Sequence, residues 1–233
     1  HGDVMAFGTM AVILFTWWLQ SLGVSIDPLP TALLALPVGI AVTALLLLGV
    51  DRGVYRFYRK VRAAPIVVVM ASLGVMFVVN GLVRFIIGPD DQNFADGARF
   101  LFTVREFRDA TGLAEGLGLR WSQVITVAVT LIVMAALFWF LNRTRTGKSM
   151  RAFSDNEDLA LLSGINPERV VTVTWLIVAA LVTVAGTLYG LDKSFKAFTY
   201  FQLLLPMFAA AILGGMGNPL GAVAGAYAIA LSE

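Results

Sequence analysis

Five stretches of about 20 residues without any charged side chain constrain this chain more than its other features do. They cover residues 4–22, 31–50, 66–83, 121–141 and 170–191. An α-helix rises about 1.5 Å per residue, so each stretch is long enough to cross the hydrocarbon core of a bilayer. The composition agrees, because 58% of the residues are hydrophobic and only 14% are charged. The sequence therefore predicts an all-α, polytopic bundle of transmembrane helices.

A further uncharged run, residues 197–232, is nearly twice as long as one crossing requires. Gly214, Gly215 and Gly217 interrupt it, so we expect two shorter helices around a glycine-rich break and about six or seven hydrophobic segments in all. Irregular backbone at membrane depth is tolerated where it lines a cavity, which makes the break a candidate element of a translocation pathway. The alternative is a tight turn between two packed helices, helped by small residues such as Gly221.

The charged residues orient these segments. Basic side chains are concentrated in residues 51–64 and at the start of residues 142–169, whereas residues 88–120 are rich in Asp and Glu. By the positive-inside rule, the two basic loops face the cytoplasm and residues 88–120 form a periplasmic loop. The aromatic residues of that outer loop suggest a partly helical segment that lies at the membrane interface or under a docked soluble protein. The net charge of +2 reflects this topology, so we expect contact with membrane lipid and no nucleic-acid partner.

The second basic loop contains the pattern of a short helix with a defined start and end. Ser154 and Glu157 have the spacing of a capping box, in which each side chain accepts from the other residue's backbone N–H. Asp155 and Asp158 would add negative charge to the first turn, and Gly164 is placed to end the helix in a left-handed conformation. We expect a helix of about nine residues outside the bilayer.

That helix would carry Leu159, Leu161 and Leu162 into the aqueous phase, where apolar side chains need a cover. A partner protein is one candidate for the cover. The ends of the chain's own membrane helices are the other, and the sequence alone does not decide between them.

Several kinds of chemistry are missing from the sequence. The chain has no cysteine, and its one histidine is His1, so it offers no thiol chemistry, no His-containing triad and no His-rich metal site. Gly147, Lys148 and Ser149 reproduce only the end of a phosphate-binding loop, so ATP would not bind here in that way. We therefore expect a protein that is not an enzyme and holds no cofactor or metal.

Ionisable groups are also rare within the predicted spans. We expect no Asp or Glu there that could relay protons, and Arg84 is the only ionisable group near hydrocarbon depth. Arg84 is either a side chain that reaches back to the interface or a contact for a transported substrate. Asn80, one helical turn earlier, shares its face and could assist either role. Both residues join the three interrupting glycines as candidates for a translocation pathway.

The chain resembles the permease subunit, the H component, of ATP-binding-cassette (ABC) importers for branched-chain amino acids. Three segments carry the resemblance: the His-Gly-Asp of residues 1–3 followed by Gly8, the loop segments 145–152 and 161–170, and the late glycine-rich segment 209–222. The likeness covers nearly the whole of residues 1–233, which we interpret as one permease domain trimmed at both ends.

The resemblance implies a set of partners. A periplasmic binding protein would deliver the substrate, a second permease subunit would complete the pathway, and two separate ATPase subunits would hydrolyse ATP at the bacterial inner membrane. The docking loop of bacterial importers carries an E-A-A-x-x-x-G element, here represented by Asp158, Leu159, Ala160 and Gly164. The implied docking residues are Ser154, Asp155, Glu157, Asp158, Ala160 and Gly164.

Two alternatives remain beside this assignment. A permease for urea or short amides belongs to a closely similar group. An ion-coupled secondary transporter belongs to a different class, and the expected lack of acids within the spans argues against it.

Overall fold

The structure is a computed structural model that describes residues 2–23, 31–88, 90–92, 94, 100–102, 119–215, 217 and 219–232. Within that part of the chain, six helical segments are long and apolar enough to cross a membrane: α1 (Gly2–Ser21), α2 with its continuation (Ala32–Lys60), α4 (Pro65–Ile87), α6 (Ser122–Arg143 within Trp121–Arg143), α9 (Pro167–Asp192) and α10 with α11 (Ala197–Gly214). The predicted all-α polytopic bundle is confirmed, and each of the five uncharged runs corresponds to one long helix.

Shorter elements connect and extend these helices. The continuation of α2 (Ala32–Val50) consists of a π-helical turn, η1 (Asp51–Tyr55), and α3 (Arg56–Lys60). Between α6 and α9 lie α7 (Arg145–Asp155) and α8 (Glu157–Leu162). The last apolar run contains α10 (Ala197–Gln202), α11 (Leu204–Gly214) and α12 (Pro219–Ser232).

Helices α1, α2 and α9 pack closely because small residues line their contacts. A Cβ atom on Gly186 of α9 would collide with Thr9 of α1, and one on Gly39 of α2 would collide with Val12. The hydroxyl of Thr183 donates to that of Thr43 at 3.0 Å, which satisfies polar groups buried between α9 and α2. Such small-residue contacts let apolar helices approach where no hydrophobic force favours one helix over lipid.

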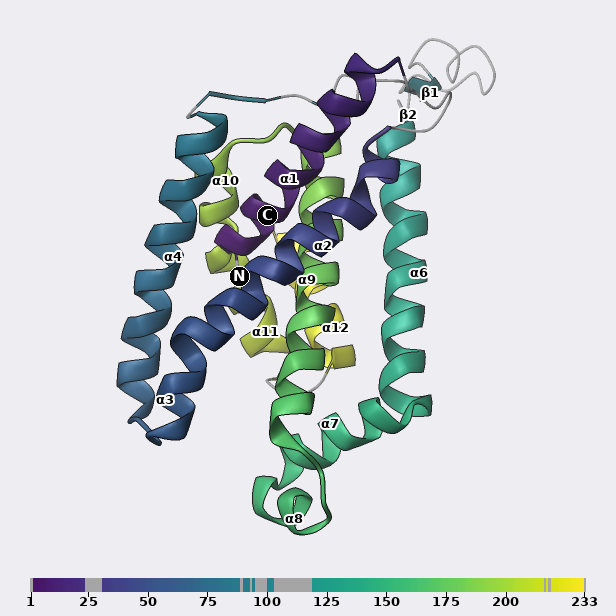
Figure 1. The fold of residues 1–233 in the computed structure, drawn as a ribbon. Helices are drawn as coiled ribbons and strands as arrows, with labels where there is room; N and C mark the ends of the chain where they lie inside the picture. Colours follow the sequence, from purple (N-terminus) through teal and green to yellow (C-terminus); the bar gives the residue numbers. More distant parts are fainter. Residues whose placement is uncertain are drawn as a thin grey trace.

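The two ends of the bundle carry different connections. Figure 1 places α3, α7 and α8 at one end, and the strand pair β1 (Phe100–Phe102) and β2 (Leu119–Arg120) at the other. An ion pair of 3.4 Å between Arg56 and Glu168 joins the two basic loops directly. The structure thus brings both loops to one end, as the predicted topology requires. The side of the membrane that this end faces stays a prediction.

The outer loop was predicted to be partly helical, and most of it lies outside the described residues; the part that is described includes two short strands. Antiparallel pairing joins β1 to β2, and a further bridge joins Gln92 to Phe195 at the start of α10. Alternating aromatic residues suit an extended strand as well as an interfacial helix, so the composition of the loop did not separate the two. The remainder of the predicted loop, including residues 103–118, lies outside the described residues.

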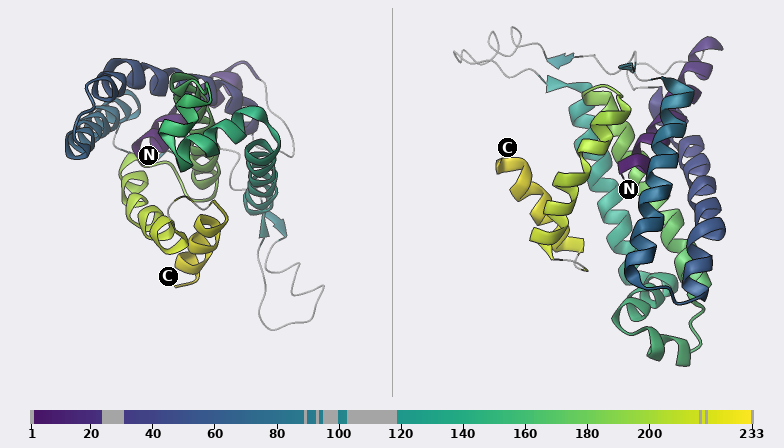
Figure 2. Two further views of the ribbon diagram at one scale, coloured as in Figure 1. Left: turned by 90° about the horizontal axis from the view of Figure 1, so that it is seen from below. Right: turned by 90° about the vertical axis from the view of Figure 1, so that its left-hand side faces the viewer.

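Helices α11 and α12 form a hairpin beside the main bundle, as the two views of Figure 2 show. A Cβ atom on Gly214 would collide with the carbonyl of Gly221, and one on Gly225 with the carbonyl of Ala210. Between the helices, Gly215 has a φ angle of 87°, which side chains with a Cβ rarely adopt. The predicted break is confirmed, and its geometry is that of a tight turn between two packed helices.

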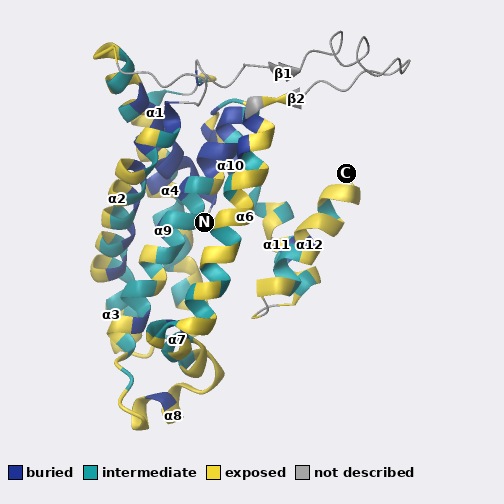
Figure 3. Ribbon diagram, turned by 90° about the vertical axis from the view of Figure 1, so that its right-hand side faces the viewer, coloured by how far each residue is buried: buried dark blue, intermediate teal, exposed yellow. Residues whose placement is uncertain are grey.

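Burial is uneven across the bundle. Figure 3 shows the buried residues gathered in α1, α10 and the adjoining part of α9, with exposed residues along α6. Apolar side chains on α4 and α6 are largely exposed, among them Phe77 at 69% and Ile132 at 68%. Such exposed apolar surfaces are stable where they face lipid or another membrane helix and not water.

Candidate translocation cavity and docking end

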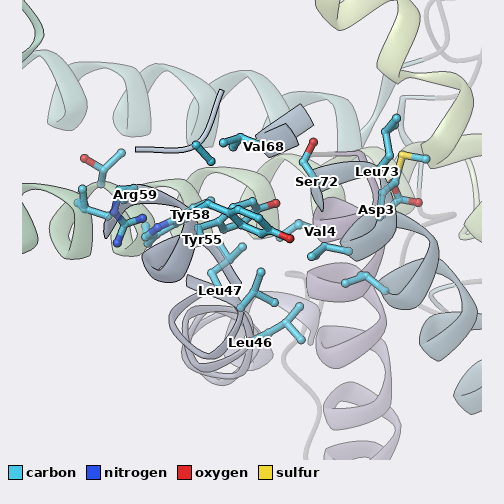
Figure 4. Close-up of a pocket in the computed structure, with 18 of the residues that line it drawn as sticks. Asp3, Val4, Leu46, Leu47, Tyr55, Tyr58, Arg59, Val68, Ser72 and Leu73 are labelled. Atoms are coloured by element: carbon cyan, nitrogen blue, oxygen red, sulfur yellow. The ribbon is translucent and has the colours of Figure 1, made fainter. Parts of the chain in front are cut away.

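A cavity of about 1070 Å³ opens among α1, the α2–α3 segment, α4, α7, α9 and α11. Its walls are predominantly aliphatic and aromatic, and Figure 4 shows Leu46, Leu47, Tyr55 and Val68 among the side chains that line it. The lining runs from Asp3 in α1 to the α3–α4 connection and the end of α7. A cavity of this size and polarity suits a small ligand with an apolar side chain.

One end of the cavity holds a buried carboxylate. Asp3 is 3% exposed, and the side-chain amide of Asn80 in α4 donates to its Oδ1 at 2.7 Å. A helix long enough to cross the membrane therefore contains one buried acid, whereas the prediction that no acid in the spans relays protons stays a prediction. The uncharged run starts at residue 4, but the helix that contains it already includes residue 3.

The two polar residues predicted on α4 have different surroundings. Asn80 is partly buried and donates to Asp3, whereas Arg84 is exposed, and neither residue is among those that line the cavity. The exposed position of Arg84 near the end of α4 agrees with a side chain that reaches back to the interface. The two residues lie one turn apart on α4, as predicted, and they differ in burial.

Asp51 forms a polar cluster at the other end of the cavity. It is 4% exposed, and it accepts hydrogen bonds from Arg59 at 2.5 and 3.0 Å and from the Trp175 indole at 2.8 Å. The ring of Tyr55 stacks on that of Trp175, with their centroids 5.7 Å apart. A buried carboxylate is stable only when paired and hydrogen-bonded, and this one receives three bonds.

Sequence reasoning missed this Asp51 cluster. Asp51 is the one acid in a strongly basic loop, and that isolation was the available signal. Trp175 carried no signal, because a tryptophan within an apolar run is ordinary. The cluster joins the end of α2, at the π-helical turn, to α9. Such turns are frequent at functional sites.

The predicted capping box of the docking loop is wrong. Ser154 lies inside α7, which begins after Thr144 and continues to Asp155. The backbone becomes extended at Asn156, whose Oδ1 accepts from the N–H of Leu159 at 3.0 Å. Asn156 is thus the N-cap of α8, and the helix has 6 residues, fewer than expected. Asn is as good an N-cap as Ser, so the local pattern contained two competing starts.

The predicted end of the helix is confirmed. Gly164 has a φ angle of 79°, its N–H donates to Leu161, and the N–H of Ile165 donates to Ala160, both at 3.0 Å. These two bonds make a Schellman motif, which satisfies the last carbonyls of a helix. Pro167 then occupies the first turn of α9, where its missing N–H costs nothing.

The leucines of α8 point away from the chain. Leu159, Leu161 and Leu162 are 61%, 43% and 85% exposed. Packing on the chain's own helix ends, the alternative left open by the sequence, therefore does not cover them in the described structure. Ala160 is 4% exposed and faces inward, so among the predicted docking residues it is placed to seat the helix.

The remaining predicted docking residues are open to contact. Ser154, Asp155, Glu157, Asp158 and Gly164 are all exposed. They lie at the end of the bundle that also carries α3, and Ser154 in addition lines the cavity.

The interrupting glycines lie apart from the cavity. Gly214, Gly215 and Gly217 are not among the residues that line it, although Leu204 and Phe208 of the same apolar run are. A role for these glycines in a pathway stays a prediction.

Six helices able to cross a membrane and a large cavity between them define a multi-pass membrane protein with the architecture of a transporter. The whole chain, residues 1–233, matches the family described as "Branched-chain amino acid transport system / permease component", and it belongs to that family. The resemblance inferred from the sequence is confirmed.

Curated relatives agree with the family. The chain is 26% identical over its whole length to the high-affinity branched-chain amino acid transport permease BraD of Pseudomonas aeruginosa, of which it spans 74%. It is 35% identical to the corresponding permease LivH of Escherichia coli K12 over 48% of this chain and 36% of LivH. A probable LivH of Methanocaldococcus jannaschii is 26% identical over 73% of this chain and 50% of that protein. No solved structure matches the chain significantly.

Proposed function

We propose that this chain is a permease subunit of an ABC importer that carries branched-chain amino acids across the bacterial inner membrane. The observation that carries the proposal is the match of the entire chain to the permease family. The cavity supports it, because walls built from Val, Leu, Met and aromatic residues accommodate a branched aliphatic side chain.

The exposed surface of α8 is the proposed docking site for a separate ATPase. Its leucines are uncovered in this chain, its ends are fixed by the Asn156 cap and the Schellman motif, and Ala160 seats it on the bundle. A short helix whose two ends are fixed in this way can transmit a displacement of the ATPase to the permease. The assembled importer also contains two ATPase subunits, a second permease subunit and a periplasmic binding protein.

Transport in this proposal is a rigid-body movement of helices around a fixed cavity. ATP binding and hydrolysis bring the two ATPases together and apart, and α8 moves with the ATPase on which it docks. The binding protein selects the substrate, and the permease offers a cavity of lower affinity. The break at Gly215 and Gly217 is retained as a proposed contact for the substrate carboxylate. The N–H of Gly215 donates to Ile212 at 3.2 Å in this structure, so such a contact requires this bond to open.

The test is uptake by the complete importer, reconstituted in vesicles with its ATPases and binding protein. ATP-dependent accumulation of leucine, isoleucine or valine supports the proposal, and an ATPase variant unable to hydrolyse ATP is the control. Uptake of urea or short amides without leucine would replace the substrate assignment. Uptake driven by an ion gradient in the absence of the ATPases would overturn the ABC importer assignment.

A further inference from the structure

The fold leaves one oxygen of the Asp3 carboxylate without a hydrogen-bond partner. Asp3 is the one carboxylate among the residues that line the cavity in the described chain. Its Oδ1 accepts from Asn80, but its Oδ2 is fully buried and has no hydrogen-bond partner there. A buried carboxylate oxygen without a partner is costly, and native structures rarely retain one without a reason.

Neither of the two arginines that line the cavity, Arg59 and Arg62, donates to the free oxygen of Asp3. Arg59 is held by Asp51, and Figure 4 shows Arg59 and Asp3 at opposite ends of the cavity. The nearer walls include the apolar residues Val4 and Leu73. Ser72 also lies on this side, but its hydroxyl donates to the carbonyl of Val69 at 2.7 Å and does not reach the second oxygen of Asp3. What this end of the cavity lacks is a small cation that can donate hydrogen bonds.

We infer that Asp3 accepts the ammonium group of the transported amino acid, while the apolar walls hold its branched side chain. The inference rests on the proposed function. An α-ammonium group carries a positive charge and three donors on a compact centre, which suits one free carboxylate oxygen in an apolar setting. Asp3 is then a substrate-binding residue of the permease itself, and it favours amines over neutral amides.

A substitution at position 3 can distinguish binding of the substrate ammonium from a purely structural role of Asp3. An Asn at position 3 has nearly the shape of Asp and can still accept from Asn80 through its own Oδ1. Asp3→Asn therefore preserves the contact between α1 and α4 and removes only the charge. If Asp3 served packing alone, this substitution would be nearly silent.

The first experiment compares Asp3→Asn with wild type in the complete importer, using the full permease chain. We expect leucine uptake to fall about tenfold or more, since a hydrogen bond to a charged group is lost. Assembly and the ATP hydrolysis stimulated by the leucine-loaded binding protein should stay within about twofold of wild type, a margin below 1 kcal/mol. Asp90→Asn, which removes an exposed carboxylate outside the cavity, is the matched control and should transport normally.

A second measurement reads the cavity without the binding protein. The native chain has no cysteine, so Ser72→Cys places a single thiol on the α4 wall of the cavity. Millimolar 3-methylbutylamine, which is leucine without its carboxylate, should slow labelling of that thiol by a maleimide. 4-Methylpentanoate, which is leucine without its ammonium, should not. Protection by the amine should disappear when Asp3→Asn is added.

The outcomes discriminate clearly. Normal leucine uptake by Asp3→Asn overturns the inference and leaves the proposed function intact. If Asp3→Asn fails to assemble, the Ser72→Cys protein alone decides, because equal protection by the amine and the acid overturns the inference. If the wild-type importer carries urea and no leucine, the proposed function is wrong. This result differs from leucine uptake that is unchanged by Asp3→Asn, which overturns only the inference about Asp3.

Discussion

Replacing Asn156 with Ala should weaken coupling to the ATPase, whereas replacing Ser154 with Ala should be nearly silent. The difference follows from the two helix starts. Asn156 Oδ1 accepts from Leu159 at the N-terminus of α8, while Ser154 lies in the last turn of α7 and is exposed. A sequence pattern favours Ser154 as the cap, so the pair of variants tests the structure against that pattern.

The expected magnitude follows from the size of α8. Loss of an Asn cap costs about 0.5–2 kcal/mol. Isolated helices below about 12 residues are marginal in water, and α8 has 6 residues, so it depends on its caps and on the burial of Ala160. A loss of about 1 kcal/mol lowers the ratio of ordered to frayed helix about fivefold. ATPase affinity should fall by a similar factor if docking requires the ordered helix.

Co-purification of the ATPase in mild detergent and ATP-dependent leucine uptake measure this effect together. Membrane levels of the permease should stay normal, because α8 lies outside the spans. Asn156→Asp is the matched control, since Asp caps as well as Asn does, and it should retain most of the coupling. Normal coupling in Asn156→Ala together with a defect in Ser154→Ala would refute the cap assignment.

Four further predictions address other parts of the chain. Gly164→Val should impair coupling more than Gly164→Ala in the same two assays, because a β-branched residue is strained at a φ of 79°. Single cysteines should react with an impermeant thiol reagent in intact cells at Asp90 and only after lysis at Ser154; labelling of Ser154 in intact cells would contradict the topology. Gly225→Leu should lower the melting temperature in detergent, since overpacking the α11–α12 contact costs about 1–3 kcal/mol, whereas wild-type melting would argue against that contact. Asp51→Asn should reduce uptake with the ATPase still bound, and unchanged transport would remove the cluster from the mechanism.

The membrane spans were predictable because the rule that defines them depends only on nearby residues and involves a large free energy. A charge at the centre of a bilayer is expensive, so uncharged runs mark crossings whatever their neighbours are. The ends of the helices were harder to predict, because a helix can continue beyond the uncharged run from which it was predicted. The helix around residues 66–83 extends to Ile87 and includes Arg84, and the first helix includes Asp3. That one-residue difference concealed the acid at the centre of the proposed binding site.

Contacts between distant residues were not predictable from the sequence alone. Asp51 and Trp175 are 124 residues apart and Asp3 and Asn80 are 77 apart, and no local pattern pairs them. The helix cap failed for a different reason. Ser154 and Asn156 are both good caps, and the choice depended on how far α7 continued before its backbone became extended.

The Asp51 cluster explains how movement at the docking end can reach the cavity. Helix α8 is joined to α9 by a short connection, and Trp175 lies about 12 Å along α9 from Pro167. There its indole donates to Asp51 of η1, and in the first turn of α9 Glu168 pairs with Arg56 of α3. The exposed ion pair is weak, but the bond to the buried carboxylate is expensive to break. If α8 docks on the ATPase as proposed, we expect a displacement of α9 to carry the α2–α3 segment with it.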